Sequence, residues 1–424
     1  MTASQGDAIS CDVAVIGGGP AGSTAATILA RQGFNVHVFE KERFPRFHIG
    51  ESLLPYNKPL FEDLGVLDQI ENAGFMVKHG AQFHIGDGSR CTKFRFRDGS
   101  FTDHPTAYQV DRSRFDTILL EHAEKCGATV WQEAPVTHCA VDAKNGVTMI
   151  VQPSSDTEER IVSARFLIDA SGVANFSGNR AKLREDHPHL RKVAIYGHFE
   201  GVQMPSGEEA GDIVIVRLKD AWCWLIPLSA QKTSVGLVFD KTAIKGVVPA
   251  DLFHSAVAQN PALQQRLAGA EVIGKLHTIT DFSYTNRAVV SERLVRIGDA
   301  AAFLDPIFSS GVYLAMIGGK AGAEAVADAL RKNTALTSKM RRYEKRCLSN
   351  MHTYRKMIER FYTPDMMEVL MSPRDFFQVP EAVNAILAGR LDGSWAVHWR
   401  LRLFYLLVRL QKSRGILPRI SALR

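Results

Sequence analysis

A glycine-rich turn between a hydrophobic strand and a small-residue helix constrains this chain most. The stretch from Cys11 to Gly22 reads CDVAVIGGGPAG, and Gly17, Gly19 and Gly22 follow the spacing Gly-x-Gly-x-x-Gly. In a βαβ unit, such glycines permit a tight turn, close approach of a pyrophosphate, and packing of the helix on the strand. Ala21 lies at the start of the small-residue helix. We therefore predict a dinucleotide site at the N-terminus of this helix.

An acidic residue closes the strand that follows this helix. Glu40 stands eighteen residues after Gly22, where a carboxylate can accept hydrogen bonds from both hydroxyls of a nucleotide ribose. We expect Glu40 and its neighbour Lys41 to contact a nucleotide with a free 2′-hydroxyl. The turn and this acid leave FAD and NAD both open.

The length and composition indicate a soluble protein with more than one subdomain. The chain has 424 residues, of which 46% are hydrophobic and 23% charged. This length exceeds what one hydrophobic core ordinarily holds. The first residues lack a basic and apolar leader, and no apolar run reaches the roughly 18 to 20 residues that span a bilayer. We expect a cytoplasmic location. The six cysteines form no Cys-x-x-Cys pair, so we expect reduced thiols and no metal site.

The charge balance is mildly basic. The net charge of +6 permits an acidic partner, such as a carrier protein or a lipid surface, although such an excess is most often related to solubility. Nothing in the sequence indicates nucleic-acid binding.

Local patterns predict several secondary-structure elements. Asn145-Gly146 lies between alternating apolar and polar residues, which is typical of a β-hairpin. Helices are expected over about 56–73 and 249–268, and everything beyond a small-residue helix that ends near Arg331 is expected to be helical.

Two further motifs at strand ends favour FAD over NAD. These are Asp169-Ala-Ser-Gly172 and Gly298-Asp299. Together with the glycine turn, they resemble the glutathione-reductase-type FAD fold of the p-hydroxybenzoate hydroxylase class, over roughly residues 11–331. The resemblance implies that Asp299 binds the ribityl hydroxyls, that Arg112 reaches the phosphate and ribityl region, and that Asp169 and Gly172 contact the cofactor.

This resemblance and the order of the expected elements along the chain together predict an α/β fold with three parts. A Rossmann-like FAD-binding domain is interleaved with an antiparallel-sheet substrate domain, and a helical region follows at the C-terminus. The expected FAD-binding domain comprises residues 8–80, 108–175 and 285–332, the β-rich domain residues 81–107 and 176–284, and the helical region residues 333–424.

A second set of motifs resembles the flavin-dependent halogenases. Trp222, Trp224, Ile226 and Pro227 form the pattern Trp-x-Trp-x-Ile-Pro, although two tryptophans on one side of a strand are usually explained by core packing. Asp305-Pro-Ile-Phe-Ser-Ser-Gly resembles the family's loop beside the flavin ring, and Gly50-Glu-Ser-Leu-Leu-Pro matches a motif of its phenol and pyrrole members.

Membership of this family implies specific roles. Pro306 and Gly311 would contact the flavin, and backbone amides near Ser310 and Gly311 would hold chloride or bromide. The Trp-x-Trp-x-Ile-Pro strand would wall a tunnel. A catalytic lysine is expected on a strand after Gly50-Glu-Ser-Leu-Leu-Pro, and Lys78 fits that place, whereas Lys58 lies on the polar face of an expected helix.

The resemblance implies a halogenase-like oxidoreductase. Reduced FAD from a flavin reductase, with O2 and a halide, would yield hypohalous acid that Lys78 directs to a phenol or pyrrole, free or bound to an acyl carrier protein. The alternatives within this fold are an aromatic hydroxylase and a geranylgeranyl-reductase-like enzyme. A non-catalytic FAD-binding subunit is a further alternative, which would need neither the halide loop nor the lysine.

The C-terminal run 395–410 is apolar with interspersed arginines. Seven basic residues and one acidic residue lie between Leu391 and Arg424, so this run could make peripheral contact with a membrane surface. A helix of this kind more often packs its apolar stripe on the core. The preceding residues 343–380 are rich in Met, Tyr, Phe and Arg and are expected to cover the substrate chamber.

Overall fold

The first sheet is built on the expected βαβ unit. The computed structural model describes residues 9–99, 103–154, 158–280, 283–372, 377–390 and 395–424. The strand order is β18-β19-β10-β1-β2-β7, with β1 parallel to both β2 and β10. β8 and β9 extend this sheet as an antiparallel hairpin beside β10. The strands are β1 (Ile9–Ile16), β2 (Val36–Phe39), β7 (Thr129–Trp131), β8 (Val136–Asp142), β9 (Gly146–Val151), β10 (Arg160–Asp169), β18 (Val290–Ser291) and β19 (Leu294–Arg296).

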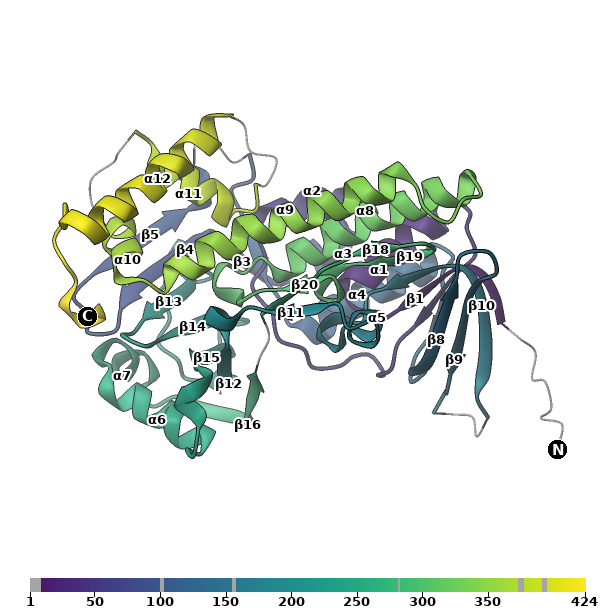
Figure 1. The fold of residues 1–424 in the computed structure, drawn as a ribbon. Helices are drawn as coiled ribbons and strands as arrows, with labels where there is room; N and C mark the ends of the chain where they lie inside the picture. Colours follow the sequence, from purple (N-terminus) through teal and green to yellow (C-terminus); the bar gives the residue numbers. More distant parts are fainter. Residues whose placement is uncertain (1–8, 100–102, 155–157, 281–282, 373–376, 391–394) are drawn as a thin grey trace.

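A second, seven-stranded sheet lies at the other end of the molecule (Figure 1). Its order is β16-β12-β15-β14-β13-β4-β5, and every neighbouring pair is antiparallel except β13 with β4. The strands are β4 (Gly80–Ile85), β5 (Cys91–Arg95), β12 (Lys192–Glu200), β13 (Ile213–Arg217), β14 (Ala221–Pro227), β15 (Thr233–Asp240) and β16 (Glu271–Thr280).

Two small sheets lie outside these large ones. β3 (Met76–Lys78) pairs with β6 (Ala107–Gln109) and places Lys78 opposite Ala107. β17 (Tyr284–Asn286) pairs with β11 (Arg184–Asp186) and β20 (Ala302–Phe303). The α/β class with an interleaved antiparallel sheet, predicted from the sequence, is confirmed.

Most of the predicted helices are present, but two are broken. The expected helix over 56–73 is wrong, because α2 (Lys58–Leu64) ends at Gly65, whose φ is +71°, before α3 (Leu67–Asn72) begins. The expected helix over 249–268 is also wrong, since Pro261 separates α6 (Pro249–Gln259) from α7 (Pro261–Leu267). The hairpin at Asn145-Gly146 is confirmed between β8 and β9.

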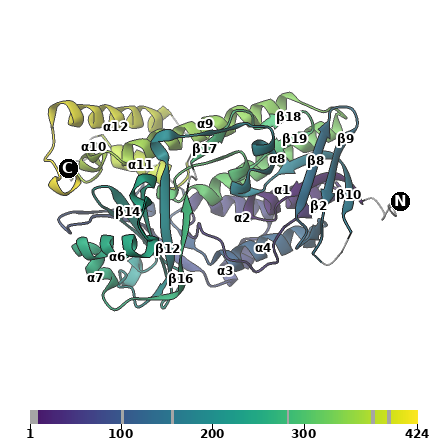
Figure 2. The same cartoon turned by 60° about the horizontal axis from the view of Figure 1, so that its bottom comes forward.

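Two long helices connect the parts of the molecule (Figure 2). α8 (Gly311–Arg331) crosses α1 (Pro20–Ala30) closely, since a Cβ added at Gly319 would lie 2.6 Å from the Ala21 carbonyl oxygen. α9 (Ser338–Phe361) runs beside α8 and reaches the second sheet. The remaining helices are α4 (Arg112–Lys125), α5 (Phe176–Arg180), α10 (Pro364–Leu370), α11 (Val379–Leu387) and α12 (Trp395–Arg414).

The apolar side of α12 packs inward. Val397, Leu401 and Phe404 are buried in one cluster with residues of α10 and α11, whereas Trp395 and Leu406 remain exposed. Core packing thus accounts for most of the apolar residues of 395–410. Within the described ranges, no helix combines the length and the apolar character needed to cross a membrane.

Candidate active site

The glycine turn after β1 has the geometry that its spacing predicts. Gly17 has a φ of +100°, and a Cβ there would lie 2.4 Å from the Ala170 carbonyl oxygen. A Cβ at Gly22 would lie 1.9 Å from the Gly17 carbonyl oxygen. At Gly19, chain neighbours apart, Nη2 of Arg46 is the one atom of the described residues within 4 Å of an added Cβ, at 3.5 Å. The fold itself therefore requires Gly17 and Gly22, whereas Gly19 leaves open space at the N-terminus of α1.

This open space suits a pyrophosphate. Gly19 is the N-cap of α1, and the first turn of α1 carries no acidic residue and no side-chain cap. The Arg46 guanidinium lies beside it, held by Glu42 at 3.3 Å and by Asp116 at 3.2 Å. Free backbone N–H groups, a helix dipole and a cation together favour a phosphate group.

Glu40 lies where β2 ends and faces the same turn. Its carboxylate is buried and accepts hydrogen bonds from the Gly18 N–H at 2.7 Å and the Glu42 N–H at 2.9 Å. Each oxygen retains a lone pair for a ribose hydroxyl. Lys41 is exposed and lies 3.9 Å from Glu42, so the structure gives it no fixed direction toward the turn.

A second candidate cofactor site lies at Asp299 and the start of α8. Within the described part of the chain, no donor is hydrogen-bonded to the Asp299 carboxylate, and burial raises its pKa to about 7 against the opposing charge of Arg112. Gly311 begins α8 without a side-chain cap from Ser310, and an added Cβ there would meet nothing within 4 Å. A free acceptor and a free helix N-terminus fit the ribityl chain and the ring of a flavin.

Arg112 mainly holds neighbouring protein segments in place. It is buried, and its guanidinium donates to Asp116 at 2.7 and 2.9 Å and to the carbonyl oxygens of Ile49 and Gly50 at 2.8 and 3.2 Å. These bonds fix the segment that leads into Glu51. Its predicted contact with FAD stays a prediction.

Asp169 has a similar structural task at the end of β10. Its carboxylate accepts hydrogen bonds from the backbone N–H of Ser171 at 3.0 Å and from the N–H and hydroxyl of Ser177 at 2.7 and 2.5 Å. Gly172 follows with a φ of +63° and open space around its Cα. The pair thus shapes the turn beside Gly17, and direct contact with the cofactor stays a prediction.

Lys78 is enclosed by the Gly50–Pro55 motif, as its predicted role requires. Its side chain is 2% exposed, and Nζ donates to the Ser52 hydroxyl oxygen at 2.9 Å and to the Leu53 carbonyl oxygen at 3.0 Å. Nζ also lies 5.4 Å from the centre of the Phe96 ring. By contrast, Lys58 lies near the surface and pairs with Glu71 at 3.4 Å.

The enclosure changes the acidity of Lys78. Burial lowers its pKa from 10.5 to about 7, although the charge of Asp212 acts in the opposite direction. At neutral pH both the ammonium and the amine are therefore populated. Among the described residues, Ser52 and Leu53 are the two acceptors, so one ammonium hydrogen is available for a ligand there.

The lowered pKa of Lys78 predicts a pH-dependent stability. The unfolded chain keeps this proton up to pH 10.5, whereas the folded chain loses it above about pH 7. The free energy of unfolding should therefore rise with pH across this window by up to about 1.4 kcal/mol per pH unit from Lys78 alone. Denaturant unfolding at several pH values, compared with a Lys78→Met variant, would measure the difference. Equal slopes for the two proteins would contradict the buried, weakly basic lysine.

The Trp-x-Trp-x-Ile-Pro segment forms β14 in the middle of the second sheet. Trp222, Trp224 and Ile226 face one hydrophobic cluster, whereas Cys223 and Leu225 face another, so the expected common side of the two indoles is confirmed. Trp224 Nε1 donates to the Ser234 hydroxyl at 3.1 Å, and Pro227 ends the strand. In the part of the chain that the structure describes, no hydrogen bond or ring contact joins either indole to Lys78.

The loop before α8 begins at Asp305, which is buried. Its carboxylate accepts hydrogen bonds from the Tyr362 hydroxyl at 2.5 Å and from the Ile307 N–H at 3.2 Å. Burial raises the pKa of Asp305 to about 6. Pro306 follows in a short 3₁₀ turn (Pro306–Phe308), and the chain then leads through Ser309 to Ser310.

Sequence reasoning missed three groups around these motifs. Tyr362 contacts Asp305, Arg46 faces Gly19, and His198 lies 2.6 Å from Glu51, whose second oxygen is buried and has no hydrogen-bond partner among the described residues. Glu51 lies within the recognised Gly50–Pro55 motif, so its burial could have been suspected. Tyr362 and His198 carry no local pattern that would have singled them out.

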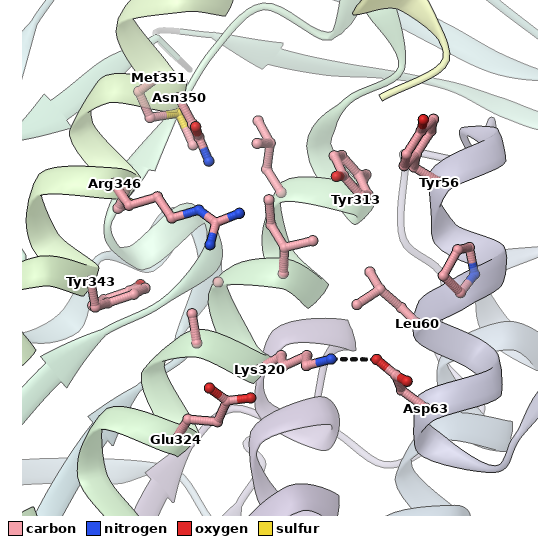
Figure 3. A pocket seen from close by; sticks show the side chains of 16 residues that line it. Tyr56, Leu60, Asp63, Tyr313, Lys320, Glu324, Tyr343, Arg346, Asn350 and Met351 are labelled. Carbon is pink, nitrogen blue, oxygen red and sulfur yellow. Dashed lines mark hydrogen bonds and ion pairs between the residues drawn. The ribbon is translucent and has the colours of Figure 1, made fainter. Parts of the chain in front are cut away.

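A cleft of about 490 Å³ lies between α2, α8 and α9 (Figure 3). Arg346 and Asn350 point into it from α9, and Lys320 of α8 forms an ion pair with Asp63 of α2. Tyr56 and Tyr313 lie at its other end. Tyr56 packs against the small cluster that contains Phe96, whose ring also contacts Lys78.

The parallel sheet, the glycine turn and the site at Asp299 together fit the class of FAD-dependent oxidoreductases. The sequence model of the tryptophan halogenase family matches residues 12–98 and 97–368. The chain therefore belongs to the flavin-dependent halogenase family, and the predictions of the family, of an oxidoreductase and of FAD as its cofactor are confirmed. Halide and O2 are the reactants typical of this family.

Individual relatives agree with this assignment. The chain is 32% identical over 375 residues to the 1H-pyrrole-2-carbonyl-[peptidyl-carrier protein] chlorinase of Pseudomonas fluorescens, and the match covers 83% of each chain. Among solved structures, it is similar to a flavoprotein/dehydrogenase from Cytophaga hutchinsonii, with a TM-score of 0.87, 26% identity and coverage of 96% and 100%. It is also similar to the myxobacterial chondrochloren halogenase CndH, with a TM-score of 0.75, 29% identity and coverage of 94% and 97%.

Proposed function

We propose that this protein halogenates an electron-rich aromatic ring, a phenol or a pyrrole, through hypohalous acid and Lys78. The observation that carries the proposal is the environment of Lys78, which is buried against Ser52 and Leu53 and donates to no third acceptor in the part of the chain that the structure describes. A structural lysine would gain little from such burial, because removing a charge from water is costly unless it is paired. A pKa near 7 is suited to proton donation at neutral pH.

The proposed reaction uses two sites, the cofactor site and the surroundings of Lys78. When bound and reduced, FAD supplies the oxygen chemistry that converts halide to hypohalous acid. The turn at Gly19, with Glu40 and Asp299, would hold the cofactor, and the amides of Ser310 and Gly311 would hold the halide. Since the sequence contains no second dinucleotide motif, a separate flavin reductase would supply the reduced cofactor.

Lys78 would act on hypohalous acid that reaches it along the face of β14. The free ammonium hydrogen bonds to the oxygen of the acid and polarises the oxygen–halogen bond. The aromatic carbon takes the halogen, and the ring proton and the hydroxide leave as water. Trp222 and Trp224 would wall the route, and Phe96 would shield the ammonium from water.

A carrier-bound substrate is supported by the charge around the cleft. Arg346 lines the cleft, and the same helix exposes Arg341, Arg342 and Lys345, so that α9 offers a basic surface to an acidic carrier protein. The related chlorinase is named for a pyrrole on a peptidyl carrier protein. A long thioester arm could then enter between Arg346 and Tyr56 toward Lys78.

The direct test is turnover with reduced FAD, O2 and chloride or bromide. We expect products of phenols or of carrier-bound pyrroles to show the mass and isotope pattern of a halogen. Comparison of a carrier-bound pyrrole with its free thioester would show whether the carrier is needed. Oxygenated products without halogen, together with rapid FAD reduction by NADPH, would instead identify a hydroxylase.

A further inference from the structure

A chain of partly buried hydrogen bonds joins β14 to the loop before α8 through one tyrosine. Trp222 Nε1 donates to the Tyr362 hydroxyl oxygen at 2.8 Å, and this hydroxyl donates to Asp305 Oδ2 at 2.5 Å. Asp305 Oδ1 accepts the backbone N–H of Ile307 at 3.2 Å. The hydroxyl therefore acts as donor and acceptor at once, between two segments about eighty residues apart.

The position of Tyr362 is itself fixed by two buried cations. Tyr362 caps the C-terminus of α9, where Arg217 Nη2 donates to its backbone carbonyl at 3.0 Å. Lys192 Nζ lies 3.7 Å from the centre of its ring. A cation at a helix C-terminus and one over an aromatic face are both favourable. The hydroxyl is thus held in place by groups that belong to the second sheet and α9, not to the loop.

The loop that begins at Asp305 depends on contacts with other parts of the protein for its conformation. Ser309 has a φ of +55°, a conformation that is unfavourable for a residue other than glycine and that persists only when its surroundings impose it. Ser310 and Gly311 follow directly, and α8 begins there without a side-chain cap. The buried carboxylate of Asp305 connects this loop to the rest of the protein by its hydrogen bond with Tyr362.

We propose that Tyr362 is a positioning residue that couples Trp222 to the loop 305–311, so that β14 sets the place of the backbone amides at Ser310 and Gly311. Trp222 then has a second task besides walling a route, since its indole N–H orients the tyrosine hydroxyl. The importance of this coupling for halide use rests on the proposed function. The mechanical link between the three side chains does not.

Hydrogen exchange of the protein without cofactor tests the link directly. In a Tyr362→Phe variant, the ring and its cation contact remain, but Asp305 and Trp222 each lose a partner. We expect the amides of residues 307–311 to exchange about tenfold faster or more. Tyr354→Phe is the matched control, because Tyr354 is buried on α9 and its hydroxyl donates to the Ile386 carbonyl oxygen at 3.3 Å, with no hydrogen bond to the loop 305–311 among the described residues.

Trp222→Phe provides a second, independent variant. It removes the indole N–H while keeping an aromatic side chain, so we expect the same faster exchange, and the double variant should add little because both changes break one chain. Equal exchange in Tyr362→Phe and Tyr354→Phe, or fully additive effects of Tyr362→Phe and Trp222→Phe, would overturn the proposal.

The consequence for catalysis is measured with halide. If the chain halogenates, Tyr362→Phe should raise the KM for halide about tenfold while kcat changes less than about twofold. Its affinity for FAD, followed by flavin fluorescence, should stay within about twofold of the parent. An unchanged KM for halide would overturn the proposed role in halide use. Absence of halogenation by the parent protein would instead refute the proposed function and leave the exchange result standing.

Discussion

A Lys78→Ala variant should lose halogenation by roughly a hundred- to ten-thousand-fold, the usual contribution of a positioned proton donor. The reason is that no other cation is in a position to replace it: Ser52 and Leu53 accept hydrogen bonds from its ammonium and from no other side chain among the described residues. Oxidation of reduced FAD should continue at close to the parent rate. Hypohalous acid should then escape and be captured by an added small-molecule trap.

Two further variants separate this role from effects on folding. Lys78→Met keeps an unbranched side chain of similar length in the buried site and should retain FAD while losing halogenation. Lys58→Ala removes the competing lysine, which lies at the surface beside Glu71, and should retain full activity. Halogenation by Lys78→Met at the parent rate would remove Lys78 from the mechanism, and loss of activity in Lys58→Ala would transfer the role to Lys58.

The parts of the site that the sequence predicts are those encoded in short spacings. The local spacing alone predicts that Gly17 and Gly22 cannot carry a side chain. In the structure, a Cβ at these two positions would lie 2.4 and 1.9 Å from a backbone carbonyl oxygen. The common side of Trp222 and Trp224 follows equally from the alternation of a strand. The choice of Lys78 depended on the family resemblance, and its hydrogen bond to Ser52, twenty-six residues away, was not predicted.

The parts that the sequence does not predict depend on contacts across the fold. Tyr362 meets Asp305 from 57 residues away, and His198 meets Glu51 from 147 residues away. No spacing rule connects such residues, because their approach depends on how α9 and β12 pack. The break at Gly65 was missed for a different reason. A glycine at a helix C-cap is a local signal, but the helical pattern over 56–73 continues past it and obscured it.

A Gly19→Asp variant should fold normally and lose FAD. Gly19 has a φ of −69° and caps α1, a place where aspartate is favoured, and the space around it is open except for Arg46. The new carboxylate would face the site proposed for the pyrophosphate, where like-charge repulsion costs several kcal/mol. We therefore expect FAD affinity, measured by flavin fluorescence, to fall at least roughly a hundredfold, while thermal unfolding of the protein without cofactor stays near the parent value.

Two related substitutions distinguish an effect of charge from effects of side-chain shape and of misfolding. Gly19→Asn has nearly the same shape as Gly19→Asp and also caps a helix, but it carries no charge, so it should weaken FAD binding less. Gly22→Ala should damage the protein without cofactor, because its Cβ would lie 1.9 Å from the Gly17 carbonyl oxygen. If Gly19→Asp and Gly19→Asn weaken FAD equally, steric exclusion and not phosphate charge is decisive at this turn. If Gly19→Asp binds FAD as the parent does, the pyrophosphate does not lie at the N-terminus of α1, and the assignment of Glu40 to the ribose is lost with it.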